Sequence, residues 1–357
     1  MTSPYQSWQD QVRAAIQSEQ ALNICGASSK AFYGHKATGR KLDMTSNSGI
    51  IDYDPAELVM VVKSGTSLKT IQAELASHQQ MLGFEPPFAA QGATIGGAVA
   101  SGLSGAGRPY LGGVRDYLLG AKLINGEAEI VQFGGKVMKN VAGFDLFRPM
   151  AGAMGTLGVL VEVSLRLIPI PEYQINLCLS LDDQGTAIKQ MNKWGEKLPS
   201  LSAANWLVNK LHLRLSGSKL AVDRDLSLIQ NIFSTQETKD NIWENISTFK
   251  HDYFTPDKTL PMLALINLPP TTPPLALEGE QLIDWGGGRR FLKTTLNGTD
   301  IRQYIHALGG NVTLLNSDQQ DDYFDSPPAA LMAVHQKLKS AFDPSHIFNP
   351  GRLYPNL

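Results

Sequence analysis

Glycine is concentrated between Gln91 and Leu160, and this stretch constrains the fold more than any other part of the chain. It opens with QGATIGGAVASG at residues 91–102 and closes with GAMGTLGV at residues 152–159. Each glycine costs backbone entropy on folding, so this density indicates positive φ angles or the close approach of a ligand. Successive bare N–H groups also form a concave site for anions such as phosphate. A tight turn explains any single glycine well, but the clusters together favour a ligand.

A further small-residue loop lies upstream of this stretch. The sequence predicts a short buried strand at residues 21–25, followed directly by GASSKAFYG at residues 26–34. Open N–H groups, hydroxyl donors and one lysine are suited to a diphosphate. This loop lacks the G-x-G-x-x-G spacing, and G-x-x-x-x-G-K-[ST] occurs nowhere in the chain. The sequence therefore argues against a Rossmann dehydrogenase and against a P-loop NTPase.

Composition limits the class of protein. A chain of 357 residues is long enough for two domains. A net charge of −2 means that the chain has no excess of basic residues, so nucleic acid is not an expected partner. Two cysteines, Cys25 and Cys178, indicate neither a disulfide framework nor a metal cluster, and they fit a reducing compartment. Without a signal sequence or an apolar run of membrane-spanning length, we expect a cytoplasmic protein with no direct membrane insertion. Membrane association through partner subunits stays open.

Hydrophobic spacing predicts the elements of the first half. A helix is expected behind Ser7, its predicted N-cap, and a second helix from Leu68 to Ala76 behind the cap residues 65–67. Two strands are expected at residues 49–53 and 58–62, joined by an Asp-Pro turn.

The second half mixes helices and strands. Composition changes after Pro171, where a strand at residues 173–181 and a helix at residues 186–197 are predicted. A helix around residues 226–233, a strand at residues 262–268 and a helix from Ala329 to Leu338 follow. Helices and strands at this spacing are typical of an α+β domain. The run LPPTTPP at residues 268–274 is expected to be a stiff surface segment.

Together the segments GASSKAFYG, DPAELVMVVKSGTSLKTIQAEL, PPFAAQGATIGGAVASG, GGVRDYLLGAKLINGE and AGFDLFRPMAGAMGTLGVLVEV resemble one FAD-binding domain. The family is the PCMH type, that of p-cresol methylhydroxylase and vanillyl-alcohol oxidase. The resemblance implies an α+β fold with a two-subdomain PCMH-type FAD-binding domain at residues 1–171 and a small α+β cap at residues 172–310. A C-terminal segment, residues 311–357, is then expected to pack back on the FAD domain.

The same resemblance implies which residues hold FAD. The first loop would wrap the pyrophosphate with Gly26, Ala27, Ser28, Ser29, Lys30 and Gly34. The second stretch would lie along the ribityl chain and pyrophosphate with Ala93, Thr94, Gly96, Gly97, Ser101 and Gly102. The third would lie beside the adenine end with Gly155, Gly158 and Val159. Met154 stands where many relatives have glutamate. Relatives that bind FAD covalently often do so through a histidine in the first loop. This loop has no histidine before His35, so non-covalent FAD is expected.

Two motifs indicate a more specific group within this family. The segments at residues 135–145 and 283–291 resemble the FAD-binding E-type subunits of bacterial glycolate oxidases, with Phe144 and Gly287 as departures. This implies an FAD-binding subunit of a glycolate oxidase or dehydrogenase complex, relaying electrons between a catalytic flavin subunit and an iron–sulfur subunit. A self-sufficient FAD-dependent 2-hydroxy-acid dehydrogenase and a non-enzymatic assembly subunit are the alternatives. The C-terminal D-P-x-x-x-x-N-P-G resembles the tail of FAD-linked 2-hydroxy-acid oxidases, and a simple helix stop followed by a turn explains it equally well.

The catalytic residues are not assigned by the sequence. Oxidation of a 2-hydroxy acid needs a base for the hydroxyl proton and a cation for the carboxylate. The histidine-rich motif of catalytic relatives is absent, and the seven histidines stand apart from one another. Arg289 and Arg290 are either carboxylate ligands or an exposed pair at a strand edge, and we favour the exposed pair. No Cys, His and carboxylate cluster shows the spacing of metal ligands.

Overall fold

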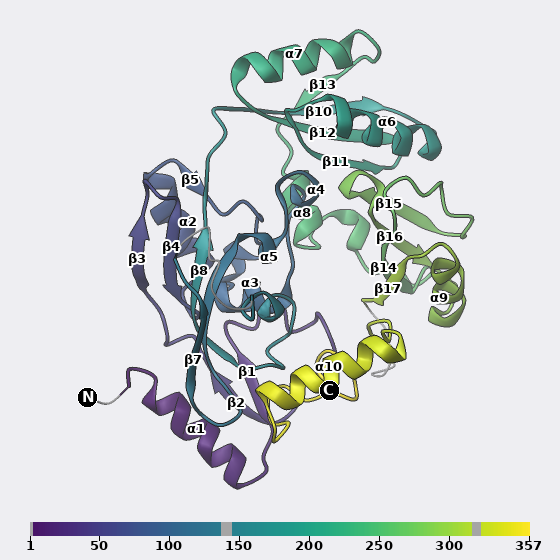
Figure 1. Ribbon diagram of the computed structural model, residues 1–357. Helices are drawn as coiled ribbons and strands as arrows, with labels where there is room; N and C mark the ends of the chain where they lie inside the picture. Colours follow the sequence, from purple (N-terminus) through teal and green to yellow (C-terminus); the bar gives the residue numbers. More distant parts are fainter. Residues whose placement is uncertain (1–2, 137–144, 316–322) are drawn as a thin grey trace. The chain divides into compact units, whose positions relative to one another are not determined.

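The computed structural model describes residues 3–136, 145–315 and 323–357, and these divide into two compact units (Figure 1). The first unit takes residues 1–103, 113–170 and 326–357, and the second takes residues 104–112 and 171–325. The second unit thus includes residues 104–112 and 311–325, which the sequence assigned to other parts of the chain. Most of the motif at residues 135–145 falls in residues 137–144, outside the described residues.

The first unit combines helices with short strands (Figure 1). Its helices are α1 (Gln6–Gln17), α2 (Leu68–Ser77), α3 (Ile95–Ser101), α5 (Val114–Tyr117), α10 (Ala329–Phe342) and the 3-10 turns η1 (Ala89–Gln91) and η2 (Arg148–Met150). Its strands are β1 (Leu22–Cys25), β2 (Arg40–Asp43), β3 (Ile50–Asp54), β4 (Val59–Lys63), β5 (Gln80–Met81), β6 (Leu118–Ile124), β7 (Ile130–Gly134), β8 (Val159–Arg166) and β9 (Ile168–Pro169).

A five-stranded antiparallel sheet of order β3-β4-β8-β6-β7 forms the centre of this unit. Its inner strands β4 and β8 are rich in buried valine and leucine, as expected for strands covered on both faces. Helix α2 begins where the sequence predicted, because the Ser67 hydroxyl accepts a hydrogen bond from the amide of Thr70 at 3.0 Å. Helix α1 starts two residues earlier than predicted, at Gln6 behind Tyr5 instead of behind Ser7.

A two-stranded parallel sheet, β1-β2, carries the first glycine-rich loop at its end. The loop at residues 26–34 follows β1 directly, as predicted. The C-terminal segment continues this sheet, because Leu22 forms a parallel bridge with Phe348. Residues more than 300 positions apart therefore meet beside the loop.

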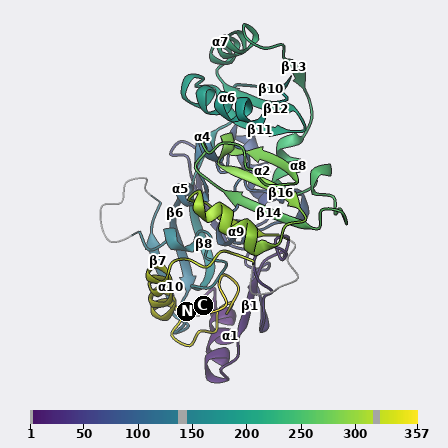
Figure 2. The same cartoon turned by 90° about the vertical axis from the view of Figure 1, so that its right-hand side faces the viewer.

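The second unit is an eight-stranded antiparallel sheet with helices (Figure 2). Its strands are β10 (Tyr173–Ser180), β11 (Leu201–Leu207), β12 (Lys210–Gly217), β13 (Gln236–Thr238), β14 (Met262–Asn267), β15 (Glu280–Asp284), β16 (Arg289–Thr294) and β17 (Asn311–Leu314). Its helices are α4 (Arg108–Leu111), α6 (Gln184–Lys197), α7 (Lys219–Gln230), α8 (Ile242–Ser247), α9 (Gly298–Ala307) and the 3-10 turns η3 (Asp252–Phe254) and η4 (Trp285–Gly287).

The sheet contains the same topology twice. The first half runs β10-α6-β11-β12-α7-β13 with strand order β13-β10-β12-β11, which is a split βαβ arrangement. The second half has strand order β15-β16-β14-β17, the same order read from the other side, and it joins the first half through β11 and β15. Where the first half has α6, the second half has the segment from Leu268 to Gly279 without a helix. The predicted strands β10 and β14 and the predicted helix α6 are confirmed, whereas the helix predicted around residues 226–233 begins at Lys219 and ends at Gln230. The duplicated topology has no counterpart in a visible sequence repeat.

A buried arginine holds the proline-rich segment that takes the place of this helix. Arg290 is 0% exposed and donates hydrogen bonds to the carbonyls of Gly287 at 3.2 Å and Pro273 at 2.7 Å, and to the carbonyl of Thr272. Burial lowers the pKa of Arg290 to about 10, so the guanidinium stays charged at neutral pH. The expectation of an exposed arginine pair was wrong, since Arg289 is also buried, beside Asp284. In a central strand such long side chains reach carbonyls and carboxylates inside the unit.

Replacing this arginine is expected to destabilise the second unit. Arg290→Met leaves buried carbonyls without donors, so the free energy of unfolding should fall by about 2–4 kcal/mol in chemical denaturation. Lys219→Met is the control, because Lys219 forms an exposed ion pair with Asp223 at 2.8 Å, and solvent screens such pairs so that they contribute little to stability. Equal losses in the two variants would contradict an anchoring role for Arg290.

Candidate functional site

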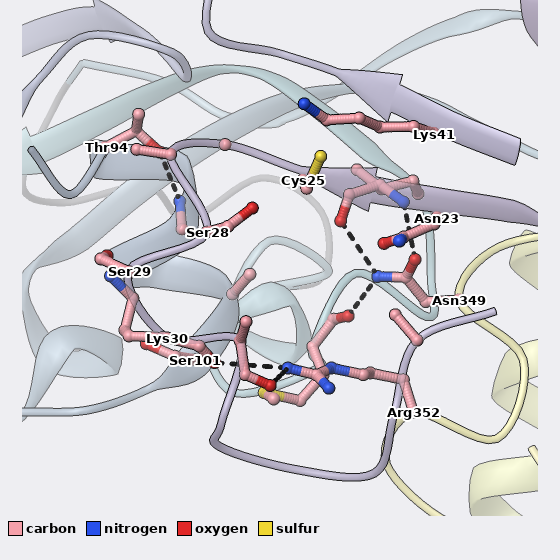
Figure 3. A pocket seen from close by; sticks show the side chains of 18 of the residues that line it. Asn23, Cys25, Ser28, Ser29, Lys30, Lys41, Thr94, Ser101, Asn349 and Arg352 are labelled. Atoms are coloured by element: carbon pink, nitrogen blue, oxygen red, sulfur yellow. Dashed lines mark hydrogen bonds between the residues drawn. The ribbon is translucent and has the colours of Figure 1, made fainter. Parts of the chain in front are cut away.

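Two adjoining cavities in the first unit bring the glycine-rich segments together, and Figure 3 shows residues that line the larger one. The larger has a volume of about 410 Å³ and the smaller about 60 Å³. Both are lined by Ile24, Cys25, Gly26, Thr94, Gly97, Ala100 and Met154. Segments from β1, from the start of α3 and from the turn before β8 therefore surround one continuous site.

Most of the residues predicted from the sequence line these cavities. They are Gly26, Ala27, Ser28, Ser29, Lys30, Thr94, Gly96, Gly97, Ser101, Gly155 and Gly158. The remaining predicted residues, all of them described, line neither cavity: Gly34, Ala93, Gly102 and Val159. Ala93 and Val159 are fully buried in the protein, so they support the site from behind. The assignment of each residue to a part of FAD stays a prediction.

Lys30 places a buried positive charge at the larger cavity. Its side chain is 9% exposed, and the ammonium donates a hydrogen bond to Ser29 Oγ at 3.2 Å and lies 5.7 Å from the centre of the Phe88 ring. Within the described parts of the chain, no carboxylate pairs with it. Burial accordingly lowers the pKa of Lys30 to about 8. A buried ammonium without a counterion is a strong binding group for an anion.

The charge of the larger cavity has one sign. Besides Lys30, its lining includes Lys36, Lys41 and Arg352, and the described lining residues include no aspartate or glutamate. Lys41 is paired outside the cavity with Asp43 at 2.8 Å. Burial raises the pKa of the Cys25 thiol, so this cavity residue is neutral at neutral pH. The site therefore attracts a ligand with negative charge.

The first loop and the start of α3 are in close contact. A Cβ on Gly26 would lie 2.3 Å from Thr94 Oγ1, so no larger residue fits there. Thr94 also caps α3, since its hydroxyl accepts a hydrogen bond from the amide of Gly97 at 3.3 Å. A Cβ on Gly97 would meet only Thr94 Oγ1 at 3.2 Å and the end of Lys30 at 3.9 Å. The side of Gly97 beside Lys30 thus opens into the cavity.

The third segment presents its backbone in an uncommon conformation. Met154 and Gly155 both have positive φ angles, 55° and 74°. A Cβ on Gly155 would lie 2.7 Å from Asn349 Nδ2, so the turn packs directly against the C-terminal segment. Met154 stands where the resemblance implied a glutamate in many relatives, and its side chain lines both cavities.

Sequence reasoning missed several lining residues. Asn23, Lys36 and Lys41 come from the β1-β2 region, and Asn349 and Arg352 from the C-terminal segment. The signal for the last two was present in the motif DPSHIFNPGR at residues 343–352. A helix stop followed by a turn explained that motif as well, and only the bridge to β1 places it at the site.

The histidines lie away from the cavities. None of the seven is among the residues that line the two cavities in the described chain. His212 is buried in β12 of the second unit, where desolvation lowers its pKa to about 4. Within the described residues, no group of three or more His, Cys, Asp or Glu side chains has the arrangement of a metal site. In the same residues, no helix combines the length and the apolarity needed to cross a bilayer.

The donor set fits the pyrophosphate of a dinucleotide. The site offers a buried ammonium, two hydroxyl-bearing residues beside it, and backbone that approaches the cavity without side chains at Gly26 and Gly97. The arrangement supplies positive charge and N–H groups where phosphate oxygens need them. The described residues therefore fit FAD.

Comparisons with known proteins agree with this geometry. The model of the FAD binding domain family matches residues 5–134. Glycolate oxidase subunit GlcE of Escherichia coli is 39% identical over 348 residues, which covers 98% of this chain and 97% of the relative. Glycolate oxidase subunit GlcD of Bacillus subtilis is 33% identical over 129 residues, covering 36% of this chain and 27% of that protein.

A solved structure confirms the fold. Alkyldihydroxyacetonephosphate synthase superposes with a TM-score of 0.67 at 13% identity, covering 96% of this chain and 73% of that protein. The predicted α+β fold of PCMH type and the predicted cofactor, FAD, are confirmed. The chain belongs to the family of FAD-binding oxidoreductases that includes glycolate oxidase subunit GlcE.

Proposed function

We propose that this chain is the FAD-binding subunit of a glycolate oxidase complex. In that complex it relays electrons between a catalytic flavin subunit and an iron–sulfur subunit. The observation that carries the proposal is the 39% identity to a glycolate oxidase subunit across nearly the whole of both chains. The substrate class is glycolate or a similar 2-hydroxy acid, oxidised to the 2-oxo acid. As part of the same proposal, the chain works in the cytoplasm, and any membrane contact is made by its partners.

The residues of the first unit bind and orient the cofactor in this proposal. Lys30 and the backbone around Gly26 and Gly97 would hold the pyrophosphate, and the turn at Met154 and Gly155 would lie beside the adenine end. FAD, when bound, supplies the capacity to accept electrons and pass them on. The cations that line the cavity would offset the negative charge of its phosphates.

The chemistry of the lining residues supports binding of the cofactor, and the experiment below separates relay from independent turnover. Oxidation of a 2-hydroxy acid requires a base near the hydroxyl group. Among the described residues that line the two cavities there is no histidine, aspartate or glutamate. Lysine, arginine, asparagine and serine supply binding groups instead, which supports a role in holding the cofactor.

Purification of the full chain alone tests this function. Loaded with FAD under anaerobic conditions, the chain is expected to keep an oxidised flavin spectrum when glycolate or lactate is added. Addition of the catalytic flavin subunit should then let glycolate bleach more flavin than that subunit contains by itself. Co-expression should yield the chain together with an iron–sulfur protein and a second flavoprotein.

Three outcomes would contradict the proposal. Rapid bleaching of the isolated chain by either 2-hydroxy acid would establish a self-sufficient dehydrogenase. A well-folded chain that stays colourless after incubation with FAD would point to an assembly subunit. Bleaching restricted to the flavin of the added catalytic subunit would exclude the relay.

A further inference from the structure

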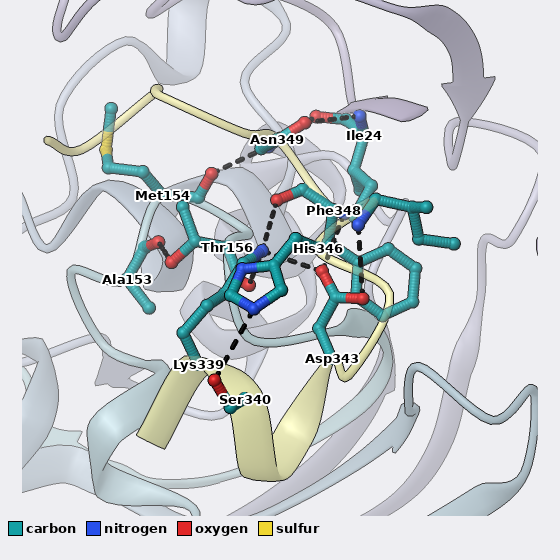
Figure 4. A network of polar contacts seen from close by, with 11 residues as sticks. Ile24, Ala153, Met154, Thr156, Lys339, Ser340, Asp343, His346, Phe348 and Asn349 are labelled. Atoms are coloured by element: carbon teal, nitrogen blue, oxygen red, sulfur yellow. Dashed lines mark hydrogen bonds and ion pairs between the residues drawn. The ribbon is translucent and has the colours of Figure 1, made fainter. Parts of the chain in front are cut away.

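The side chain of Asn349 connects two of the segments that line the cavities (Figure 4). Its Oδ1 accepts a hydrogen bond from the amide of Ile24 at 2.7 Å, and its Nδ2 donates to the carbonyl of Met154 at 2.7 Å. Asn349 is 3% exposed. The side-chain amide thus links Ile24 in β1 to Met154 in the turn before β8, and both of these residues line the cavities.

Arg352 connects the same segment to the first glycine-rich loop. Its guanidinium donates to the carbonyls of Lys30 at 3.3 Å, Ala31 at 3.1 Å and Tyr33 at 2.8 Å, and also to the carbonyl of His35. A guanidinium has five N–H donors in a fixed plane, so it can hold several carbonyls in one geometry. The backbone that carries the Lys30 ammonium is therefore fixed by a residue 322 positions away.

A buried ion pair holds this segment in place. Lys339 and Asp343 are 1% and 0% exposed, and Lys339 Nζ lies 2.7 Å from Asp343 Oδ2. The ammonium also donates to the carbonyls of Thr156 and Phe348, both at 2.8 Å. The Asp343 carboxylate accepts from the amides of Ile347 at 3.2 Å and Phe348 at 2.8 Å. All donors and acceptors of the pair are satisfied, so the position of Phe348 and Asn349 relative to Thr156 is set.

We propose that Asn349 and Arg352 are positioning residues of the FAD site: they hold the first glycine-rich loop and the turn at Met154 in the geometry that binds the cofactor. This inference rests on FAD as the ligand and is independent of the electron-relay role. Neither residue needs to touch the reacting part of the cofactor. Each acts by removing freedom from loops that are rich in glycine and would otherwise sample many conformations.

Asn349 is tested by removing its side chain without straining its backbone. Asn349 has φ of 40°, which glycine adopts freely, so Asn349→Gly deletes the two contacts and leaves the backbone path available. We expect the Kd for FAD of the full chain to rise at least tenfold. Asn349→Ser is uncharged, and its short hydroxyl cannot span both Ile24 and Met154, so an intermediate rise is expected. Hydrogen exchange of the Ile24 amide should quicken in the same order.

Gln9→Ala is the matched control for Asn349. Gln9 is also a buried side-chain amide of the first unit, and its Nε2 donates to the carbonyl of Ala128 at 2.9 Å away from both cavities. Its loss should lower thermal stability but leave the Kd for FAD within twofold of the unchanged chain. If Asn349→Gly and Gln9→Ala give the same Kd, measured well below both melting temperatures, the positioning role is refuted. Should Asn349→Gly fail to fold, Asn349→Ser decides the question against the same control.

Arg352→Lys tests whether the hydrogen bonds of the Arg352 guanidinium matter for FAD binding, or only its positive charge. The substitution keeps a cation at the cavity but cannot span four carbonyls in one plane. We expect at least a fivefold rise in the Kd for FAD together with faster exchange of the amides in residues 30–35. An unchanged Kd would show that Arg352 contributes charge alone. Failure of the unchanged chain to bind FAD is a different result, which would refute the cofactor assignment itself.

Discussion

Gly97→Val is expected to abolish retention of FAD in a chain that still folds. The position of a Cβ on Gly97 is 3.2 Å from Thr94 Oγ1 and 3.9 Å from Lys30, so the protein itself accommodates a side chain with small shifts. The two methyl groups of valine would extend into the cavity beside Lys30 and occupy the space of the cofactor. The flavin absorbance of the purified variant, divided by its protein concentration, measures the effect.

Gly96→Ala is the contrasting variant in the same helix. A Cβ there would lie 2.7 Å from Ser64 Cβ and 2.8 Å from the Ser64 carbonyl oxygen, so the added methyl group strains the protein itself. We expect reduced thermal stability for Gly96→Ala even without FAD, and normal stability of the FAD-free chain for Gly97→Val. Stoichiometric flavin in purified Gly97→Val would refute the placement of the cofactor.

Lys30→Met is expected to weaken FAD binding by about tenfold to a hundredfold. Methionine retains the volume of the side chain but removes the buried charge, and a charge-assisted hydrogen bond contributes about 1.5–3 kcal/mol. Lys36→Met is the control, since Lys36 lines the same cavity but is exposed to solvent. The two Kd values can be read from quenching of flavin fluorescence. A similar loss in both variants would mean that the cavity attracts FAD by its total charge.

Lys30 also makes FAD binding depend on pH. Burial lowers the pKa of Lys30 to about 8 in the FAD-free chain, and the nearby cations Lys36, Lys41 and Arg352 do not oppose that shift. The phosphates of FAD would favour the charged form, so binding above pH 8 requires uptake of a proton. Affinity should therefore be flat below pH 8 and fall above it, by up to tenfold for each pH unit. Lys30→Met should show no such fall.

Stability of the FAD-free chain should change in the opposite direction. Between pH 8 and 10.5, the ordinary pKa of lysine, the unfolded chain holds the proton that folded Lys30 has released. Because the unfolded state binds more protons there, the free energy of unfolding rises with pH relative to that of Lys30→Met. Parallel trends in affinity and stability would contradict a single titrating group.

Local patterns predicted the regular elements well. The stripe of Leu68, Ile71 and Leu75 behind Ser67 specifies helix α2, because spacing and cap act within a few residues. The glycine-rich segments likewise predicted much of the cavity lining, since close approach of backbone to a ligand excludes side chains locally. In each case the physical cause and the sequence signal occupy the same short stretch.

Long-range partners set the parts that the sequence did not predict. Asn349 bonds to Ile24 across 325 positions, and its motif has a sufficient local explanation as a turn. Arg290 was expected at an exposed edge, but β16 lies inside the eight-stranded sheet, between β15 and β14. Which strand lies at an edge depends on the pairing of the whole sheet. The residues of one strand do not carry that information.

The connection between Asn349 and β1 has a consequence for how the protein is made. During translation the first glycine-rich loop emerges early, and Arg352, which bonds to it, follows about three hundred codons later. Asn349 follows the turn at Met154 by 195 positions. Until then, both segments lack their hydrogen bonds to the C-terminal segment. A polypeptide cut short before Asn349 lacks these contacts, so we expect it to hold the flavin more weakly than the full chain does.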